Sequence, residues 1–218
     1  MRFNHIMSAN TLKFILCAAS ACTLLACSLP NRPPIETNSW LVAPVRTGPT
    51  YQARTDIWLR MGTVSVTPPF DGKSLVYRLG DNRYEKDFYN VYATLPNEMV
   101  SNATRQWMNQ ANMFAMTVGQ NTSFFPFYTL QASVEEFYGD YRVRPEAVVT
   151  VEFFLTVTTA GNEKPVIGNN RYTKRVALTN NTPEALVQGQ QEALAQILKL
   201  YEVELNKYAA KLPKPLGQ

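Results

Sequence analysis

The chain has 218 residues, of which 45% are hydrophobic and 11% aromatic, with 21 basic and 17 acidic side chains. Without Arg2 and Lys13, which lie in the N-terminal segment, the balance is 19 to 17, too even to indicate nucleic acid as a partner. The only histidine is His5, so a chain that loses this segment has none, which excludes Ser-His-Asp and Cys-His catalysis and histidine-ligated metal. We therefore expect no enzymatic activity and no cofactor.

Acidic side chains are the remaining route to catalysis, because two carboxylates can hydrolyse a glycosidic bond. Adjacent residues on a strand point to opposite faces, so Glu135 and Glu136 do not form such a pair by themselves. No Gly-rich phosphate-binding loop occurs either. We interpret the acids of this region as solvated surface residues: Glu135, Glu136, Asp140 and Glu152.

Residues 1–26 have the layout of a secretory signal, with a basic segment followed by an apolar run over 14–25. This run is shorter than the ~20 residues that span a bilayer. It ends in Leu24-Leu25-Ala26-Cys27, the form of a bacterial lipobox, in which cleavage before Cys27 accompanies diacylation of its thiol. The alternative is an ordinary signal that is cut elsewhere, with Cys27 a bystander.

Lipidation at Cys27 would attach the mature chain to a membrane. Ser28 follows it, and because an Asp at that position tends to retain Gram-negative lipoproteins in the inner membrane, we expect the periplasmic face of the outer membrane. The other cysteines, Cys17 and Cys22, lie in the signal, so the mature chain would have neither a free thiol nor a disulfide. Its core alone must hold the fold.

A Pro-rich segment over 27–56 is predicted to be an extended tether, within which Trp40-Leu41-Val42 would add a short edge strand. One domain over 57–212 and a short tail over 213–218 follow. Periodicity predicts these elements: a strand at 57–66, extended segments at 75–83 and 84–92, a helix at 95–113, strands at 128–137, 147–157 and 170–178, and a helix from Pro183 to about Tyr208.

Both helices carry start signals. Thr94 is expected to cap the first, whose apolar stripe includes Trp107 as a core residue. Thr182 is expected to cap the second, with Pro183 at its first position and Glu184 where the helix dipole favours an acid.

The loop at 117–127 ends in aromatic residues, the cluster at 124–128. These either enter the core with the next strand or form an exposed lip that touches lipid or a partner subunit. We favour the core, because strands commonly begin with aromatic residues.

The strand at 147–157 alternates almost perfectly, which indicates one buried and one wet face and hence an antiparallel sheet. The expected fold is α+β, a two-layer sandwich of a mostly antiparallel sheet of about five strands with two amphipathic helices on one face. Its order would be two strands, a helix, three strands and a helix.

In their order and spacing, several segments resemble the ABC-type transport auxiliary lipoproteins, a family that includes the lipoprotein of the paraquat-inducible intermembrane transport system. The segments are the lipobox, Trp40-Leu41-Val42 in the tether, Val64–Phe70 followed by Leu75–Arg78, and Thr104–Met108 with Phe114. The resemblance covers essentially the whole mature chain. One departure is Pro69-Phe70-Asp71-Gly72, where many relatives have a Tyr-Leu-Asp-Arg-like stretch, and this leaves the partner system open.

The resemblance implies a lipid-anchored periplasmic component of a system with an ABC permease, its ATPase and an MCE-domain protein. Such systems carry phospholipids or other hydrophobic molecules between the inner and outer membranes. It implies no catalytic residues, and only the lipidated cysteine transfers, onto Cys27. The chain would act as a docking module through the outer face of its sheet or an edge strand, and a homo-oligomer is one form that it could take. The alternative is a structural or assembly lipoprotein that supports an outer-membrane protein.

Overall fold

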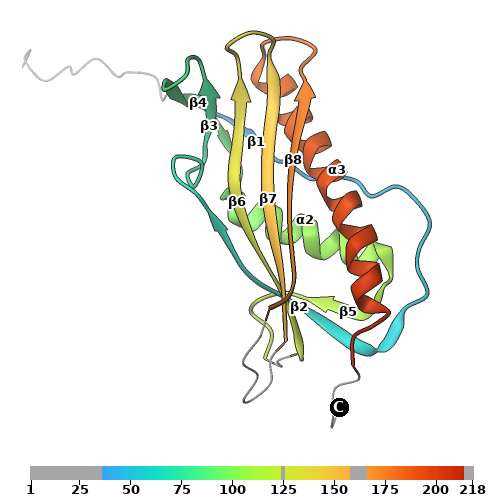
Figure 1. Ribbon diagram of the computed structural model, residues 1–218. Coiled ribbons are helices and arrows are strands. Elements are labelled where there is room, and N and C mark those ends of the chain that lie inside the picture. The colour runs from blue at the N-terminus through green and yellow to red at the C-terminus, as the bar shows by residue number, and fades with distance from the viewer. Residues whose placement is uncertain (1–35, 124–125, 158–165, 214–218) are drawn as a thin grey trace, which may run out of the picture. The chain divides into compact units, whose positions relative to one another are not determined.

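A mixed sheet with helices on one face makes up the folded part of the chain (Figure 1). The computed structural model describes residues 36–123, 126–157 and 166–213. The chain divides into two compact units, and the described helices and strands all belong to the second, Thr37–Gln218. They are β1 (Asn38–Trp40), β2 (Arg54–Val66), β3 (Ser74–Arg78), β4 (Tyr84–Tyr92), α2 (Pro96–Ala111), β5 (Phe114–Val118), β6 (Tyr128–Asp140), β7 (Glu146–Val157), β8 (Val166–Ala177) and α3 (Pro183–Ala209).

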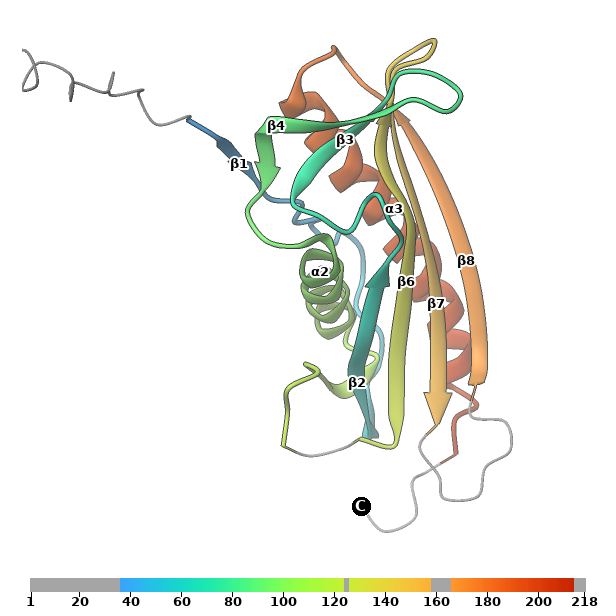
Figure 2. The ribbon, with the colours of Figure 1, turned by 90° about the vertical axis from the view of Figure 1, so that its left-hand side faces the viewer.

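Strand β6 is the centre of the sheet. One of its edges pairs with β7 in antiparallel register from Tyr128↔Val157 to Asp140↔Glu146, and β7 pairs in the same sense with β8. The other edge is divided: its first half pairs in parallel with β2, and its last residues pair in parallel with β3. Strand β5 extends the β2 side (Figure 1), whereas β4 and then β1 extend the β3 side (Figure 2).

The sequence prediction of about five mostly antiparallel strands was wrong in number and only partly correct in direction, since the long registers of β6 with β7 and of β7 with β8 are antiparallel. The described sheet has eight strands, and β1, β2, β3 and β5 each make a parallel pair. Alternating hydrophobicity reports which face of a strand is buried, and it carries no information about the direction of the neighbouring strand. The prediction of two helices on one face of the sheet was correct (Figure 1).

Helix α2 begins at Pro96, and its N-cap is Leu95 rather than the predicted Thr94. Thr94 instead donates its hydroxyl hydrogen to the carboxylate of Glu98 in the first turn. The helix ends at Ala111, and its C-cap residue Asn112 adopts the left-handed conformation (φ 57°) that asparagine tolerates better than most residues. Trp107 is buried as predicted.

Helix α3 begins as the sequence indicates, because the Thr182 hydroxyl accepts a hydrogen bond from the amide of Ala185 and Pro183 occupies the first turn. The helix lies close to the sheet at Gly189, where an added Cβ would meet Leu178 Cδ2 at 2.6 Å and Ala147 Cβ at 2.9 Å. Further along, the ring of Tyr201 stacks on that of Phe153 of β7, with centroids 4.1 Å apart. These contacts make the sheet and α3 one core.

Part of the segment predicted as a tether is folded onto the domain. The short edge strand predicted at residues 40–42 is β1 at residues 38–40, so that only Trp40 is shared, and β2 begins at Arg54 instead of residue 57. Between them lies a stretch that we call the N-terminal strap, residues 41–53. Its Val42 is buried, and Tyr51 donates its amide hydrogen to the carbonyl of Ala111 at 2.9 Å.

The aromatic cluster at 124–128 is described only in part, since Phe124 and Phe125 lie outside the described residues. Phe127 packs against the core edge-on to Tyr128, with ring centroids 4.9 Å apart. Tyr128 itself is buried, and its hydroxyl donates to the carbonyl of Pro213 at 2.8 Å. Phe127 and Tyr128 therefore belong to the core.

Candidate functional site

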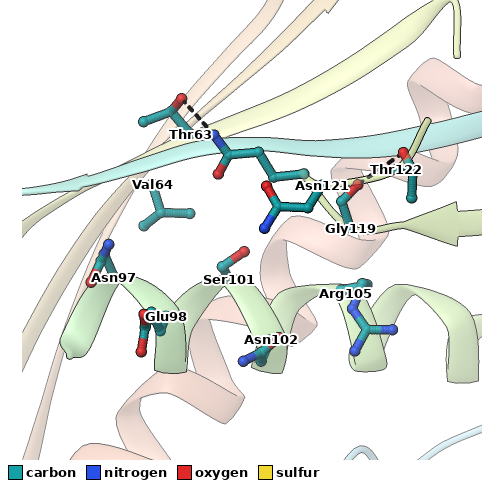
Figure 3. A pocket seen from close by; sticks show the side chains of 11 residues that line it. Thr63, Val64, Asn97, Glu98, Ser101, Asn102, Arg105, Gly119, Asn121 and Thr122 are labelled. Atoms are coloured by element: carbon teal, nitrogen blue, oxygen red, sulfur yellow. Dashed lines mark hydrogen bonds between the residues drawn. The ribbon is translucent and has the colours of Figure 1, made fainter. Parts of the chain in front are cut away.

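A polar groove of about 710 Å³ lies between α2 and the sheet (Figure 3). It is lined by Thr63 and Val64 of β2, by the side of α2 that carries Asn97, Glu98, Ser101, Asn102 and Arg105, and by the loop Gly119–Thr122. The α2 residues recur at intervals of three and four because one side of an amphipathic helix repeats with that spacing. Opposite them, the buried stripe with Met99 and Trp107 holds the helix on the sheet.

The loop side of the groove is held in place by hydrogen bonds. The Arg60 guanidinium donates to the carbonyl of Gln120 at 2.6 Å, and the Thr122 hydroxyl donates to the carbonyl of Gly119 at 3.2 Å. The side-chain amide of Gln120 donates a hydrogen bond from Nε2 to Thr63 Oγ1 at 3.5 Å (Figure 3). The lining residues include one carboxylate, Glu98, one guanidinium, Arg105, and several hydroxyl and amide side chains, so the groove offers many hydrogen-bonding groups.

A buried ionic network joins the N-terminal strap to both helices. The guanidinium of Arg46 donates twice to the carboxylate of Glu202 on α3, with Nε to Oε2 and Nη2 to Oε1 both at 2.8 Å. The indole N–H of Trp107 on α2 donates to the same Oε2 at 2.6 Å. The side chains of Arg46 and Glu202 are only 4% and 9% exposed.

Hydrogen bonding to Glu202 raises the pKa of Arg46, in opposition to the effect of burial. Burial, with the charge of Glu202 nearby, raises the pKa of the Tyr51 phenol. The network therefore holds a charged pair with a neutral phenol beside it. A carboxylate that is buried with such partners fixes where its neighbours lie, and here it fixes the path of the strap.

The acids singled out by the sequence are not one site. Glu135 forms an ion pair with Arg171, and Glu136 accepts a hydrogen bond from the Thr150 hydroxyl at 2.5 Å. Asp140 was wrongly interpreted as solvated: it is 5% exposed. Hydrogen bonds from Arg142, and more weakly from Arg175, hold the pKa of its carboxyl well below the usual range.

The described residues contain no group of three histidine, cysteine or acidic side chains placed to hold a metal ion. In the same part of the chain no helix is long and apolar enough to cross a bilayer. Cys27, the predicted lipidation site, lies outside the described residues and stays a prediction.

Strand β8 offers a second candidate surface. Its only strand partner in the described sheet is β7, so the other side of this 12-residue strand is an open edge. Its exposed side chains include Asn169, Arg171, Thr173 and Arg175. An open edge presents backbone N–H and C=O groups to which another chain can add a strand.

Sequence reasoning missed the role of Arg46 and Glu202. One signal was present, because Glu202 follows Leu198 by four residues and precedes Leu205 by three, which places an acid in the apolar stripe of α3. An acid on such a stripe requires a buried partner. The sequence did not show which residue this partner is, because Arg46 lies 156 residues away in a Pro-rich stretch.

Solved structures share this architecture. An uncharacterised protein has 15% identity and a TM-score of 0.62 over 78% of this chain and 99% of its own. A protein from Xanthomonas campestris has 14% identity and a TM-score of 0.61, and the match covers 81% of this chain and 95% of its own. A hypothetical protein from Chlamydia trachomatis has 6% identity and a TM-score of 0.51, and the match covers 71% of this chain and 98% of its own. At these identities the likeness shows the fold. No curated protein sequence matches the chain.

The protein is an α/β domain in which two strands, β2 and β3, share one edge of the central strand β6. It has a polar groove and an open strand edge, and both surfaces suit binding. Residues 41–199 match the family described as the ABC-type transport auxiliary lipoprotein component, and the chain belongs to that family. The family is one of lipoproteins that assist ABC transporters, and this places the chain in the cell envelope.

Proposed function

We propose that the chain is a lipid-anchored periplasmic docking subunit of an ABC transport system that contains an MCE-domain protein. Its cargo would be phospholipid or another hydrophobic molecule that moves between the inner and outer membranes. The family match over residues 41–199 is the observation that carries the proposal. Cys27 would carry the acyl chains, and Ser28 favours the outer membrane.

A physical requirement supports a docking role. Exposing each methylene of an acyl chain to water costs about 0.8 kcal/mol. A hydrophobic conduit therefore needs a docking site at the membrane that it serves. The open edge of β8 can serve as this docking site, because backbone groups there can pair with a strand of the conduit protein. The groove beside α2 supplies hydrogen-bonding side chains for a second point of contact.

Site-specific photocrosslinking from native membranes tests the proposal. A photoreactive residue at Asn169, exposed on β8, is expected to capture the MCE-domain protein, and the ABC permease should co-purify with it. Lys199 is the control, since it is also exposed but lies on α3 instead of β8. Capture from both positions alike would contradict docking at the β8 edge. Recovery of an outer-membrane protein without a permease would indicate the structural or assembly role instead.

A further inference from the structure

Two neighbouring aromatic side chains project from β4. Phe88 is 65% exposed and Tyr89 57% exposed, and their rings meet edge to face with centroids 5.4 Å apart. Single exposed apolar residues are common on protein surfaces, whereas two adjacent large rings held together are not explained by chance exposure. No periodic pattern in the sequence distinguishes this pair.

A bulge in β4 causes the projection. In the register with β3, Val76 faces Lys86 and Ser74 faces Val91, so two steps along β3 are matched by five along β4. The extra residues form a turn around the carboxylate of Asp87, which accepts the amide hydrogens of Tyr89 at 2.8 Å and Asn90 at 2.9 Å. The rings are thus held out by a fixed backbone.

Three further donors fix the bulge. The Tyr77 hydroxyl donates to Asp87 at 2.6 Å, and Asn90 Nδ2 donates to it at 3.0 Å. Burial alone would raise the pKa of Asp87, but these hydrogen bonds outweigh it and lower the pKa. On the other side, the Trp40 indole donates to Asn90 Oδ1 at 3.1 Å. Asn90 therefore connects the aromatic pair directly to β1.

This connection sets the distance from the rings to the predicted anchor. Strand β1 lies parallel to β4 with Asn38 opposite Asn90, two residues from Phe88 (Figure 2). Eleven residue steps separate Cys27 from Asn38, and covalent geometry limits their span to at most about 40 Å. The described chain therefore begins, at β1, beside the part of the domain that carries the rings.

We propose that Phe88 and Tyr89 contact the lipid surface that carries the chain's own acyl anchor, and so seat the domain on the membrane in one orientation. This rests on the proposed anchoring at Cys27. The chemistry is suitable, because an aromatic ring with a polar tip, such as tyrosine, is favoured at the membrane–water interface and phenylalanine inserts just below it. A second contact beside the lipid anchor also restricts the domain to one orientation relative to the membrane.

The test uses the full mature lipoprotein in vesicles of phosphatidylethanolamine and phosphatidylglycerol. With Cys27 acylated, an introduced cysteine is the only free thiol, so F88C can be labelled with an environment-sensitive dye. V203C is the control, because Val203 is an exposed apolar residue of α3 near the far end of the helix from β4 (Figure 1). Circular dichroism melting verifies that both variants fold.

At position 88 we expect emission at shorter wavelength and loss of intensity with nitroxide-labelled lipid, and neither change at position 203. Equal, water-like emission at both positions would overturn the proposal. A dye at position 88 that is wet in vesicles but shielded in native membranes would assign the rings to a protein partner and likewise overturn it. Intact mass that shows Cys27 without acyl chains would remove its basis. The vesicles contain no transporter, so a failure to recover an MCE protein would leave this result unchanged.

Discussion

Arg46 and Glu202 lie 156 residues apart in the chain and form a two-pronged buried ion pair. One residue belongs to the strap that precedes β2 and the other to the last helix, so the pair closes the ends of the domain onto each other. Trp107 completes the contact from α2.

R46A should be strongly destabilising. It leaves the Glu202 carboxylate buried with Trp107 as its remaining donor, and removing one partner of a buried pair costs on the order of 3 kcal/mol. Urea unfolding followed by fluorescence measures the loss. R83A is the matched control, since Arg83 forms an exposed pair with Glu85 and should change the stability by less than about 1 kcal/mol. Equal effects of the two variants would show that the network is solvated.

Asp140 should make stability depend on pH on the acid side. Its pKa is lower in the folded chain than the ordinary 3.8, so its stabilising contribution is complete above that value and is lost as the pH falls toward the folded pKa. The difference in unfolding free energy between the native chain and D140N should therefore be largest at neutral pH and shrink below about pH 4. D81N, at an exposed partner of the same Arg142, should show little difference at any pH.

Gly189 is predicted to resist the usual benefit of alanine in a helix. Alanine there would gain about 1 kcal/mol in helix propensity, but its Cβ would overlap that of Ala147, which cannot rotate away. We expect G189A to lose about 1–3 kcal/mol in chemical denaturation. The double variant G189A/A147G should recover part of this loss. G72A, where an added Cβ meets nothing within 4 Å, serves as the control.

C27A tests the anchor without touching the fold. The native chain should pellet with membranes, and mass spectrometry of its N-terminal peptide should show cleavage before Cys27 and two acyl chains on the thiol. The variant should lack the acyl chains and lose transport activity while it melts at the same temperature, because the described domain begins ten residues later. Full activity of a non-acylated chain would argue against docking at a membrane.

Local signals in the sequence predicted most elements well. Strand β4 has the predicted bounds of residues 84–92, and α3 begins at the Thr182 cap. Strand β5 was missed because its five residues follow a helix directly and only partly alternate in burial, so nothing separates them from a loop. Strand β7 was predicted to have one wet face, but Val148 and Thr150 on that face are buried too.

The groups that define the candidate surfaces were harder to predict. The groove needs α2 and the loop at 119–122 to face each other, and that relation depends on β5, which the sequence did not reveal. The bulge of β4 depends on how Asp87 satisfies backbone amides, whereas periodicity describes only regular strands. Tertiary hydrogen bonds of this kind leave no repeat in the sequence.

The three-residue strand β1 has a mechanical consequence. A pull from the membrane end of the chain would act along β1, which lies parallel to β4, and would load their shared hydrogen bonds together instead of opening them one after another. If those bonds yielded, the chain would lengthen only as far as Arg46, where the ion pair with Glu202 holds it to α3. The load would then pass to α3 through this ion pair, and β2 would not be pulled directly until the pair separates. Strand β1 and the strap would thus delay the unfolding of β2.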